Sequence, residues 1–290
     1  MKMSDKQLQE YMNKNILHSI KKTACLFTLG MGLVLTGGTV HATSAQPVDV
    51  TATTEVATET TEATQHKAKI VKENGESYYK NASGKKVKNK FVTVGKKTYY
   101  FGKNGVMEKG WMKKGKNYYF FDRSTGVMKK KGKVDGISIN KDGTAKVSKD
   151  AKKKVETMIL AKKIVKKQTK ATDSKQDKLK KCFDWVMKAP YKRYRIIAQV
   201  RTKKNWDVDY ANDIFKKGKG CCVSMSSAFA YLAKECGYSK VYLCDDSEHA
   251  WVEIGGKVYD VLFARAKSYD KYFNSTYKTA KLVKVNKLKI

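Results

Sequence analysis

Histidine is scarce in this chain of 290 residues, and its scarcity narrows the chemistry open to the C-terminal part. Of four histidines, His18, His41 and His66 lie near the N-terminus, so only His249 serves the rest of the chain. Any general-base chemistry by imidazole in the C-terminal region must therefore use His249.

Cysteine is also limited, and no two cysteines have the C-x-x-C spacing that is common in zinc sites. The alternative to an enzyme site is a zinc site formed by Cys221, Cys222, Cys244 and His249. These residues lack the C-x-x-C spacing, so we expect neither a metal nor a cofactor. An odd number of cysteines remains once Cys25 leaves with the N-terminal segment, so at least one thiol stays unpaired. Sequence alone does not decide whether the others form disulfides.

Acidic residues are few: 27 Asp and Glu stand against 61 Lys and Arg, which gives a net charge of +34. Such a surface attracts polyanions, whether nucleic acid, anionic lipid or acidic wall polymers. Charge alone therefore permits a nucleic-acid binder, and the cellular compartment has to decide among these partners.

The N-terminal segment predicts export. A basic flank of Lys14, Lys21 and Lys22 precedes the apolar run Thr23–Val40, and small residues follow it. This pattern predicts a signal peptide over residues 1–45. A membrane anchor is the alternative, but glycines and threonines make the run a weak span, and we expect no stable membrane span after cleavage. Residues 46–69, rich in Thr, Ala and Glu, predict a disordered linker.

An internal repeat follows, and it predicts a β-hairpin domain over residues 70–147. Tyrosine pairs recur at 78–79, 99–100 and 118–119, and glycines recur every 21 residues at 84, 105 and 126. Each unit reads as two short strands around a Gly-Lys turn. One such hairpin cannot bury its own aromatic face, so neighbouring hairpins must stack as a solenoid.

The stretch Gly110–Phe120 resembles the cell-wall-binding repeats of choline- and glucan-binding surface proteins. The resemblance implies a wall polymer or glycan as partner and a location at a Gram-positive cell wall or surface. Choline sites in that family use several tryptophans, whereas this region has Trp111 alone, which leaves carbohydrate or another wall polymer as the expected ligand. Trp111, Tyr99 and Tyr118 are the ligand candidates, provided that a ring face is exposed.

Residues 148–290 predict a mixed α and β domain. A first helix is expected over 148–168, with Val155, Ile159 and Ile164 facing inward. A second is expected to begin after the capping residue Ser174, and a third to cover 206–215. A strand is expected over 241–244, and the tail after residue 264 is read as either a last strand or an exposed segment.

A nucleophile is predicted at a helix start. Gly218-Lys-Gly-Cys-Cys222 leads into the apolar helical run Val223–Leu232, which places the cysteines at a helix N-terminus. The helix dipole and free N–H groups there stabilise a thiolate. Tyr194, in the preceding basic connection, is a possible side-chain donor to an oxyanion.

A hairpin is predicted to bring histidine and aspartate together. Residues 249–254 and 257–263 read as strands around Gly255-Gly256, a strong hairpin signal. Ile254 then faces Lys257, Trp251 faces Asp260, and His249 faces Leu262. Asp260 is diagonal to His249 on the same face, where it can orient the imidazole.

These residues resemble the Cys, His and Asp motifs of the transglutaminase-like superfamily. Gly220-Cys-Cys222, Ala228-Phe229, His249–Val252 and Tyr259-Asp260 carry the resemblance, which covers roughly residues 150–263. It implies an α+β, papain-like core with Cys222 as nucleophile, His249 as base and Asp260 as its orienter. The family places Ala and Phe six and seven residues after the nucleophile, and Ala228-Phe229 satisfies this spacing for Cys222.

The sequence thus predicts a secreted, wall-associated cysteine enzyme that acts on amide bonds of a protein or peptide, as a protease or amidase or as a cross-linking acyltransferase. A non-enzymatic adhesin with an inactive domain is the alternative. A nucleic-acid binder, suggested by charge alone, conflicts with the export signal and the repeats, and no nucleic-acid partner is expected.

Overall fold

The computed structural model describes residues 67–246 and 248–290. The predicted signal peptide over 1–45 and nearly all of the predicted linker over 46–69 lie outside the described residues. The first strand begins at Lys69, one residue before the predicted start of the repeats.

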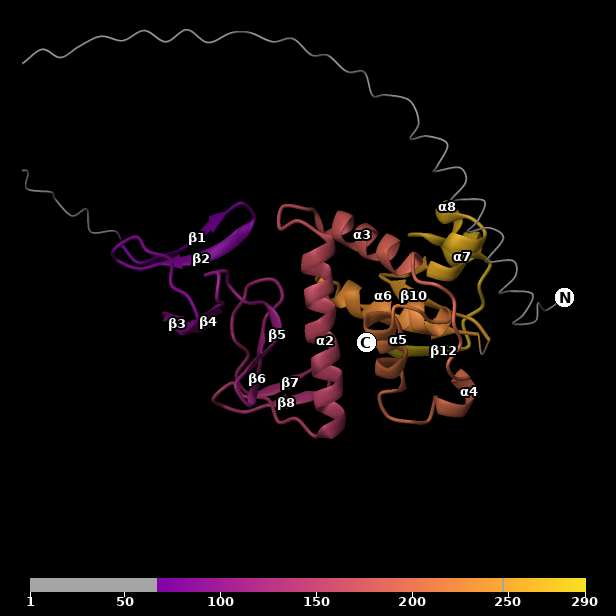
Figure 1. The fold of residues 1–290 in the computed structure, drawn as a ribbon, viewed down its shortest axis with the longest axis horizontal. Coiled ribbons are helices and arrows are strands. Elements are labelled where there is room, and N and C mark those ends of the chain that lie inside the picture. The colour runs from indigo at the N-terminus through magenta and orange to yellow at the C-terminus, as the bar shows by residue number, and fades with distance from the viewer. Residues whose placement is uncertain (1–66, 247) are drawn as a thin grey trace, which may run out of the picture. The chain divides into compact units, whose positions relative to one another are not determined.

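Four β-hairpins make up the first part of the described residues, in the order that the repeat predicts (Figure 1). Their strands are β1 (Lys69–Glu73) with β2 (Glu76–Lys80), β3 (Lys90–Val94) with β4 (Lys97–Phe101), β5 (Gly110–Lys114) with β6 (Asn117–Phe121), and β7 (Gly132–Val134) with β8 (Ile137–Ile139). The aromatic strands β4 and β6 are the most buried, as expected for hairpins that share their apolar faces.

Backbone hydrogen bonds join successive hairpins. Met107 N–H donates to Ser77, Met128 N–H to Thr98, and Ala145 N–H to Tyr118, so the segment after each of these hairpins is tied to an earlier one. Two aromatic clusters fill the spaces between the hairpins, one around Phe101 and the other around Phe121, which are both fully buried.

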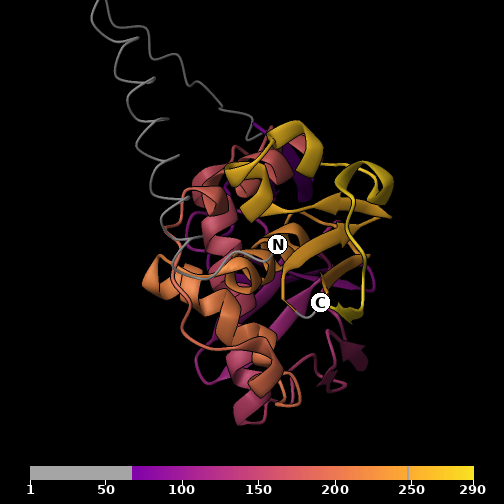
Figure 2. The ribbon, with the colours of Figure 1, turned by 90° about the vertical axis from the view of Figure 1, so that its right-hand side faces the viewer.

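The C-terminal part combines helices with one antiparallel sheet (Figure 2). The helices are α2 (Lys149–Gln168), α3 (Lys175–Met187), α4 (Ile197–Val200), α5 (Trp206–Lys217), α6 (Cys222–Glu235), α7 (Val261–Ala266), α8 (Tyr269–Tyr272) and α9 (Tyr277–Ala280). The strands are β9 (Val241–Asp245), β10 (Ala250–Ile254), β11 (Lys257–Tyr259) and β12 (Asn286–Lys289), in the sheet order β11-β10-β9-β12. The tail thus ends in a strand paired with β9.

Local signals explain the helix boundaries. Ser174 caps α3 by accepting from Asp177 N–H at 3.0 Å, as the capping motif predicts. Helix α2 buries Val155 as predicted, but its inward face continues through Met158, Ala161 and Val165, while Ile159 and Ile164 are only half-buried. This face follows helical spacing of three and four residues from Val155.

Helix α6 is buried along almost its whole length and forms the centre of the C-terminal part. It packs on α5 and on strands β9 and β10, and the Ser226 hydroxyl donates to the Ala250 carbonyl at 2.8 Å. A helix that is buried on all sides lies in a fixed position, so its N-terminus is a rigid support for a reactive group.

The hairpins pack on α2 and on the C-terminal end of α6 through buried polar groups. Arg123, which follows β6, donates to Glu235 at 2.7 Å and to Asp135 at 3.2 Å, and Asp135 also pairs with Lys234 at 3.1 Å. Lys162 of α2 donates to Glu108 and to two backbone carbonyls of the hairpins. The hairpins and the helices α2 and α6 therefore share an interface made of buried ion pairs and hydrogen bonds.

This interface uses rings that the sequence suggests as ligand sites. Trp111 is fully buried and donates to Asp135 at 2.9 Å, and Tyr118 is 2% exposed and donates to Glu156 of α2 at 2.7 Å. Tyr99 is buried in the cluster around Phe101. Neighbouring hairpins and α2 cover these three rings. None of the three therefore presents the exposed ring face that ligand binding requires.

Candidate active site

The turn before α6 is built around a close approach that requires glycine. A Cβ atom on Gly220 would lie 2.4 Å from the Cβ of Ser224 and 3.0 Å from Cδ1 of Ile214. Gly220 also exchanges backbone hydrogen bonds with the segment 190–192. The predicted sharp turn before the cysteines therefore has a specific physical cause.

The two cysteines occupy the first positions of α6. Cys221 is the N-cap residue and Cys222 is the first helical residue. The predicted placement at a helix N-terminus is confirmed. As the first residue of the helix, Cys222 has a backbone N–H without an intrahelical acceptor, and this N–H is a candidate donor to an oxyanion.

The two thiols face different surroundings. The Cys222 thiol lies 3.9 Å from the carbonyl of Glu248, the residue before His249. The Cys221 sulfur lies 3.7 Å from the Ser224 hydroxyl, which in turn donates to Asp213 at 3.0 Å. Cys222 is therefore on the histidine side of the helix start, and Cys221 is on the side of Asp213.

Ionisation of the pair is coupled. A hydrogen bond from Cys222, offset by burial and reinforced by N–H groups at the helix start, lowers the pKa of Cys221 to about 6. The same hydrogen bond, together with burial, raises the pKa of Cys222 well above its usual value. The two sulfurs share one hydrogen bond and compete for one negative charge, so ionisation of either thiol opposes ionisation of the other.

Histidine and aspartate meet as the hairpin predicts. His249 Nε2 lies 2.5 Å from Asp260 Oδ2, and Asp260 is fully buried. With Nε2 engaged by the carboxylate, Nδ1 is the nitrogen that remains for a partner. The ring stacks on Phe263 at 3.9 Å between centroids, which fixes its plane.

The hairpin register is confirmed at its turn and differs beyond Tyr259. Ile254 pairs with Lys257, around Gly255 and Gly256 with φ of 58° and 81°. Two positive φ angles are those of a type I′ turn. The strand expected over 257–263 ends at Tyr259, however, so His249 does not face Leu262 across a ladder. Asp260 ends the strand because its side chain caps α7, accepting from Phe263 N–H at 3.0 Å.

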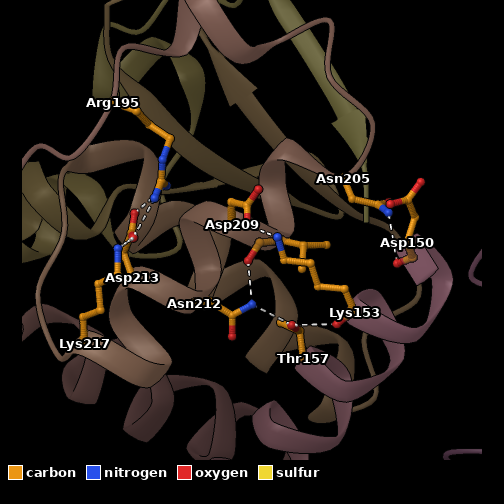
Figure 3. Close-up of polar contacts among 10 residues, drawn as sticks. Asp150, Lys153, Thr157, Arg195, Asn205, Asp209, Asn212, Asp213 and Lys217 are labelled. Carbon is orange, nitrogen blue, oxygen red and sulfur yellow. Dashed lines mark hydrogen bonds and ion pairs between the residues drawn. The ribbon is translucent and has the colours of Figure 1, made fainter.

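A buried polar cluster beside Cys221 was not identified from the sequence. Asp213 accepts two hydrogen bonds from Arg195, at 2.7 and 2.9 Å, and a third from Lys217 at 3.0 Å (Figure 3). Only the spacing of Asp213 and Lys217, four residues apart on a helix, hints at it. Because Asp213 also accepts from the Ser224 hydroxyl, this cluster fixes the first turn of α6 on the side where Ser224 lies.

A tyrosine other than the expected one lies at the cysteines. Tyr194 is 37% exposed, and the Lys217 ammonium group covers its ring at 3.9 Å. Tyr191 is buried, and burial together with the charges of Cys222 and Cys221 raises its pKa to about 12. Tyr191 therefore keeps its hydroxyl proton next to the nucleophile region.

Neither a metal site nor a membrane helix is found in the described part of the chain. Among residues 67–246 and 248–290, no group of three or more His, Cys, Asp or Glu is placed to hold a metal ion. No helix in these residues is both long and apolar enough to cross a membrane.

Comparison with known families supports both halves of the sequence interpretation. Residues 91–132 match the family model of the choline-binding repeat, and residues 160–260 match that of the transglutaminase-like superfamily. The two matches occur in the predicted order. No curated protein matches the chain.

Solved structures resemble about a quarter of the chain. Choline-binding protein F from Streptococcus pneumoniae is 28% identical with a TM-score of 0.26, over 28% of this chain and 27% of its own. The choline-binding domain of another S. pneumoniae protein is 26% identical, with a TM-score of 0.25, over 27% of this chain and 93% of its own. Alternansucrase from Leuconostoc mesenteroides is 29% identical with a TM-score of 0.24, over 28% and 7%. The chain thus spans about a quarter of the length of the first of these proteins.

Proposed function

We propose that this chain is a cell-wall-associated cysteine enzyme that cleaves amide bonds by acyl transfer, with Cys222 as nucleophile. The observation that carries the proposal is the arrangement at one end of α6: the half-buried His249 on the buried Asp260 carboxylate and, beside this pair, the Cys222 thiol against the carbonyl of the residue before His249. Thiol, imidazole and carboxylate in this order are the parts of a nucleophilic acyl-transfer site.

Each residue has a defined role in the proposed reaction. His249 takes the proton of Cys222, and the sulfur attacks the amide carbonyl. Asp260 orients the imidazole and stabilises its charged form, since their 2.5 Å contact leaves little freedom. The N–H of Cys222 stabilises the oxyanion. The imidazolium then protonates the leaving amine, and water, activated by His249, releases the acid.

Wall association is supported by the match to choline-binding repeats and by the net charge of +34. An acidic wall polymer would meet a surface rich in lysine. The repeats would hold the catalytic part near the wall, and a protein or wall-linked peptide would supply the amide. Water is proposed as acceptor, and transfer to a lysine amine is the competing outcome.

The test compares the two adjacent cysteines in the full chain. Purified protein is incubated with peptides that carry a primary carboxamide, with and without a fluorescent amine, and ammonia release and amine incorporation are measured. Cys222→Ala and His249→Ala should abolish both signals. Cys221→Ala is the matched control and should retain activity, because its sulfur lies on the Asp213 side of the helix start.

Asp260 gives a graded outcome. Asp260→Asn should lower kcat less than Cys222→Ala does, because an orienting group contributes less than the nucleophile. Full activity in Cys222→Ala with a dead Cys221→Ala would transfer the role of nucleophile to Cys221. Activity that survives both substitutions would leave the non-enzymatic, wall-binding alternative as the better interpretation.

A further inference from the structure

Two cysteines outside the candidate active site lie in contact. Cys182, on the inner face of α3, and Cys236, the residue that caps the end of α6, have their sulfur atoms 3.8 Å apart. They are separated by 54 residues in the sequence, and both are buried. The fold therefore brings two distant thiols to van der Waals distance inside the core.

We propose that Cys182 and Cys236 form a disulfide bond in the exported protein. A disulfide requires the two sulfurs, now 3.8 Å apart, to approach to about 2.0 Å, and rotation about the two Cα–Cβ bonds is the movement that brings them together. The bond joins α3 to the end of α6 opposite Cys222. It does not depend on the proposed activity, because neither residue takes part in the chemistry.

The other cysteines are less suited to a bond. The Cys244 sulfur accepts from the Tyr277 hydroxyl at 3.8 Å, on the sheet. Cys221 and Cys222 are in contact with each other, but a bond between neighbours closes an eight-membered ring around their shared peptide. That ring would distort the first turn of α6. The pair Cys182–Cys236 instead joins two different helices, α3 and the end of α6.

The reaction needs an oxidant, and a small-molecule or protein disulfide supplies it. The two thiols release two protons and two electrons, one sulfur–sulfur bond forms, and the oxidant's disulfide is reduced to two thiols.

Burial sets the time at which the bond forms. The hydrogen bond with Cys182 and burial raise the pKa of the Cys236 thiol, so the reactive thiolate is rare once the chain has folded. We therefore expect oxidation during folding after export, before the core closes. The same burial then protects the bond from reductants.

The test uses the full chain recovered from the medium or the wall, and the same chain refolded with oxidised glutathione. Free thiols are alkylated under denaturing conditions, and the protein is digested with trypsin without reduction. Cleavage at lysine gives Cys182 in the peptide 182–188, Cys236 in 235–240, and Cys221 with Cys222 in 220–234. Mass spectrometry should find peptides 182–188 and 235–240 linked, and peptide 220–234 alkylated at both cysteines.

Thermal unfolding gives a second readout. Reductant present during folding should lower the melting temperature of the wild type by roughly 5–15 °C, because the bond restricts the unfolded chain. Cys236→Ala should show no such difference, and the matched control Cys244→Ala should keep it. Alkylated 182–188 and 235–240 in both preparations, or a bond within 220–234 instead, would overturn the proposal.

Discussion

Gly220 is the residue on which the geometry of the nucleophile turn depends most directly. In Gly220→Ala the new methyl group would lie 2.4 Å from the Cβ of Ser224 in α6 and 3.0 Å from Cδ1 of Ile214 in α5. We expect a loss of about 2–3 kcal/mol in the free energy of unfolding, by overpacking. Displacement of the helix start should also slow alkylation of Cys222. Chemical denaturation and timed labelling measure the two effects.

Gly218→Ala is the matched control for this substitution. Gly218 has φ of 71° but nothing within 4 Å of an added Cβ, so only backbone strain is introduced. The expected loss is about 1 kcal/mol, with an unchanged labelling rate. Equal stability of Gly220→Ala and the wild type would show that the close approach is not as tight as the structure has it.

At the scale of single residues, the sequence predicted that His249 and Asp260 meet, but it did not predict how each is held. Cys222, His249 and Asp260 could be singled out as candidates because the helix start, the Gly-Gly turn and the alternation of strand faces are local patterns. The capping role of Asp260 toward Phe263 was missed, because the residues after Tyr259 also alternate as a strand would. The cluster at Asp213 was missed because Arg195 and Ser224 reach it only through the fold.

At the scale of helices and strands, the carboxylate of Glu253 connects strand β10 to the C-terminal tail that contains Lys284 and Lys287. Glu253 is buried, which acts to raise its pKa, but hydrogen bonds from Lys284, Lys287 and Tyr277 lower the pKa to about 2. A carboxyl group with a lowered folded pKa stabilises the protein above its unfolded pKa, near 4.5. That contribution is lost as the pH falls through the folded pKa, between about 4.5 and 2.

Glu253→Gln tests this pH dependence. Between pH 5 and pH 2 the wild type should lose about 1–3 kcal/mol more unfolding free energy than the variant, and urea denaturation at each pH measures it. Glu73→Gln is the control, because Glu73 pairs with Lys80 and Lys86 at a surface position, and the loss there should be much smaller. Parallel pH curves for the wild type and Glu253→Gln would contradict the prediction.

The contact of the hairpins with α6 also depends on buried charge. The side chains of Arg123 and Glu235 are 14% and 3% exposed, and Asp135 shares the same guanidinium group. Arg123→Ala leaves two buried carboxylates short of a partner, so we expect a loss of about 3–5 kcal/mol. Lys80→Ala, in a surface pair with both side chains more than a third exposed, should cost less than about 1 kcal/mol. Denaturant unfolding compares the two, and a similar small loss for both would show that the interface does not bear on stability.

The sequence predicted most of the helices and strands, but not the side-chain contacts between them. The hairpin repeat follows from its period and helix α3 from its capping residue and apolar spacing, which are local. The burial of Trp111 and Tyr118 follows from α2 and from Asp135, far along the chain, and no local pattern signals that. The inward face of α2, by contrast, follows the local spacing of three and four residues from Val155, so Met158 and Val165 are buried in place of Ile159 and Ile164.

For the whole molecule, the excess of positive charge predicts how attachment responds to salt. If lysines of the repeats contact an anionic wall polymer, the full chain should pellet with isolated walls at low salt and be released as salt increases. Exposed charges are screened beyond about 10 Å at 0.1 M salt, whereas stacking of a sugar on an aromatic ring is much less affected. Sedimentation over a salt series therefore separates the two modes of attachment.

The control for the salt experiment is a variant that loses positive charge in the repeats and keeps the charge of the rest of the chain. Replacing Lys113, near the end of β5, and Lys116, in the turn between β5 and β6, by glutamine removes two exposed charges. If the charges bind, the variant should detach at a lower salt concentration than the wild type. If instead both proteins stay bound to the highest salt, ring or hydrogen-bond recognition of the polymer holds the chain. If neither pellets at low salt, the repeats serve as a spacer, and the proposed wall association fails while the activity test at Cys222 still stands.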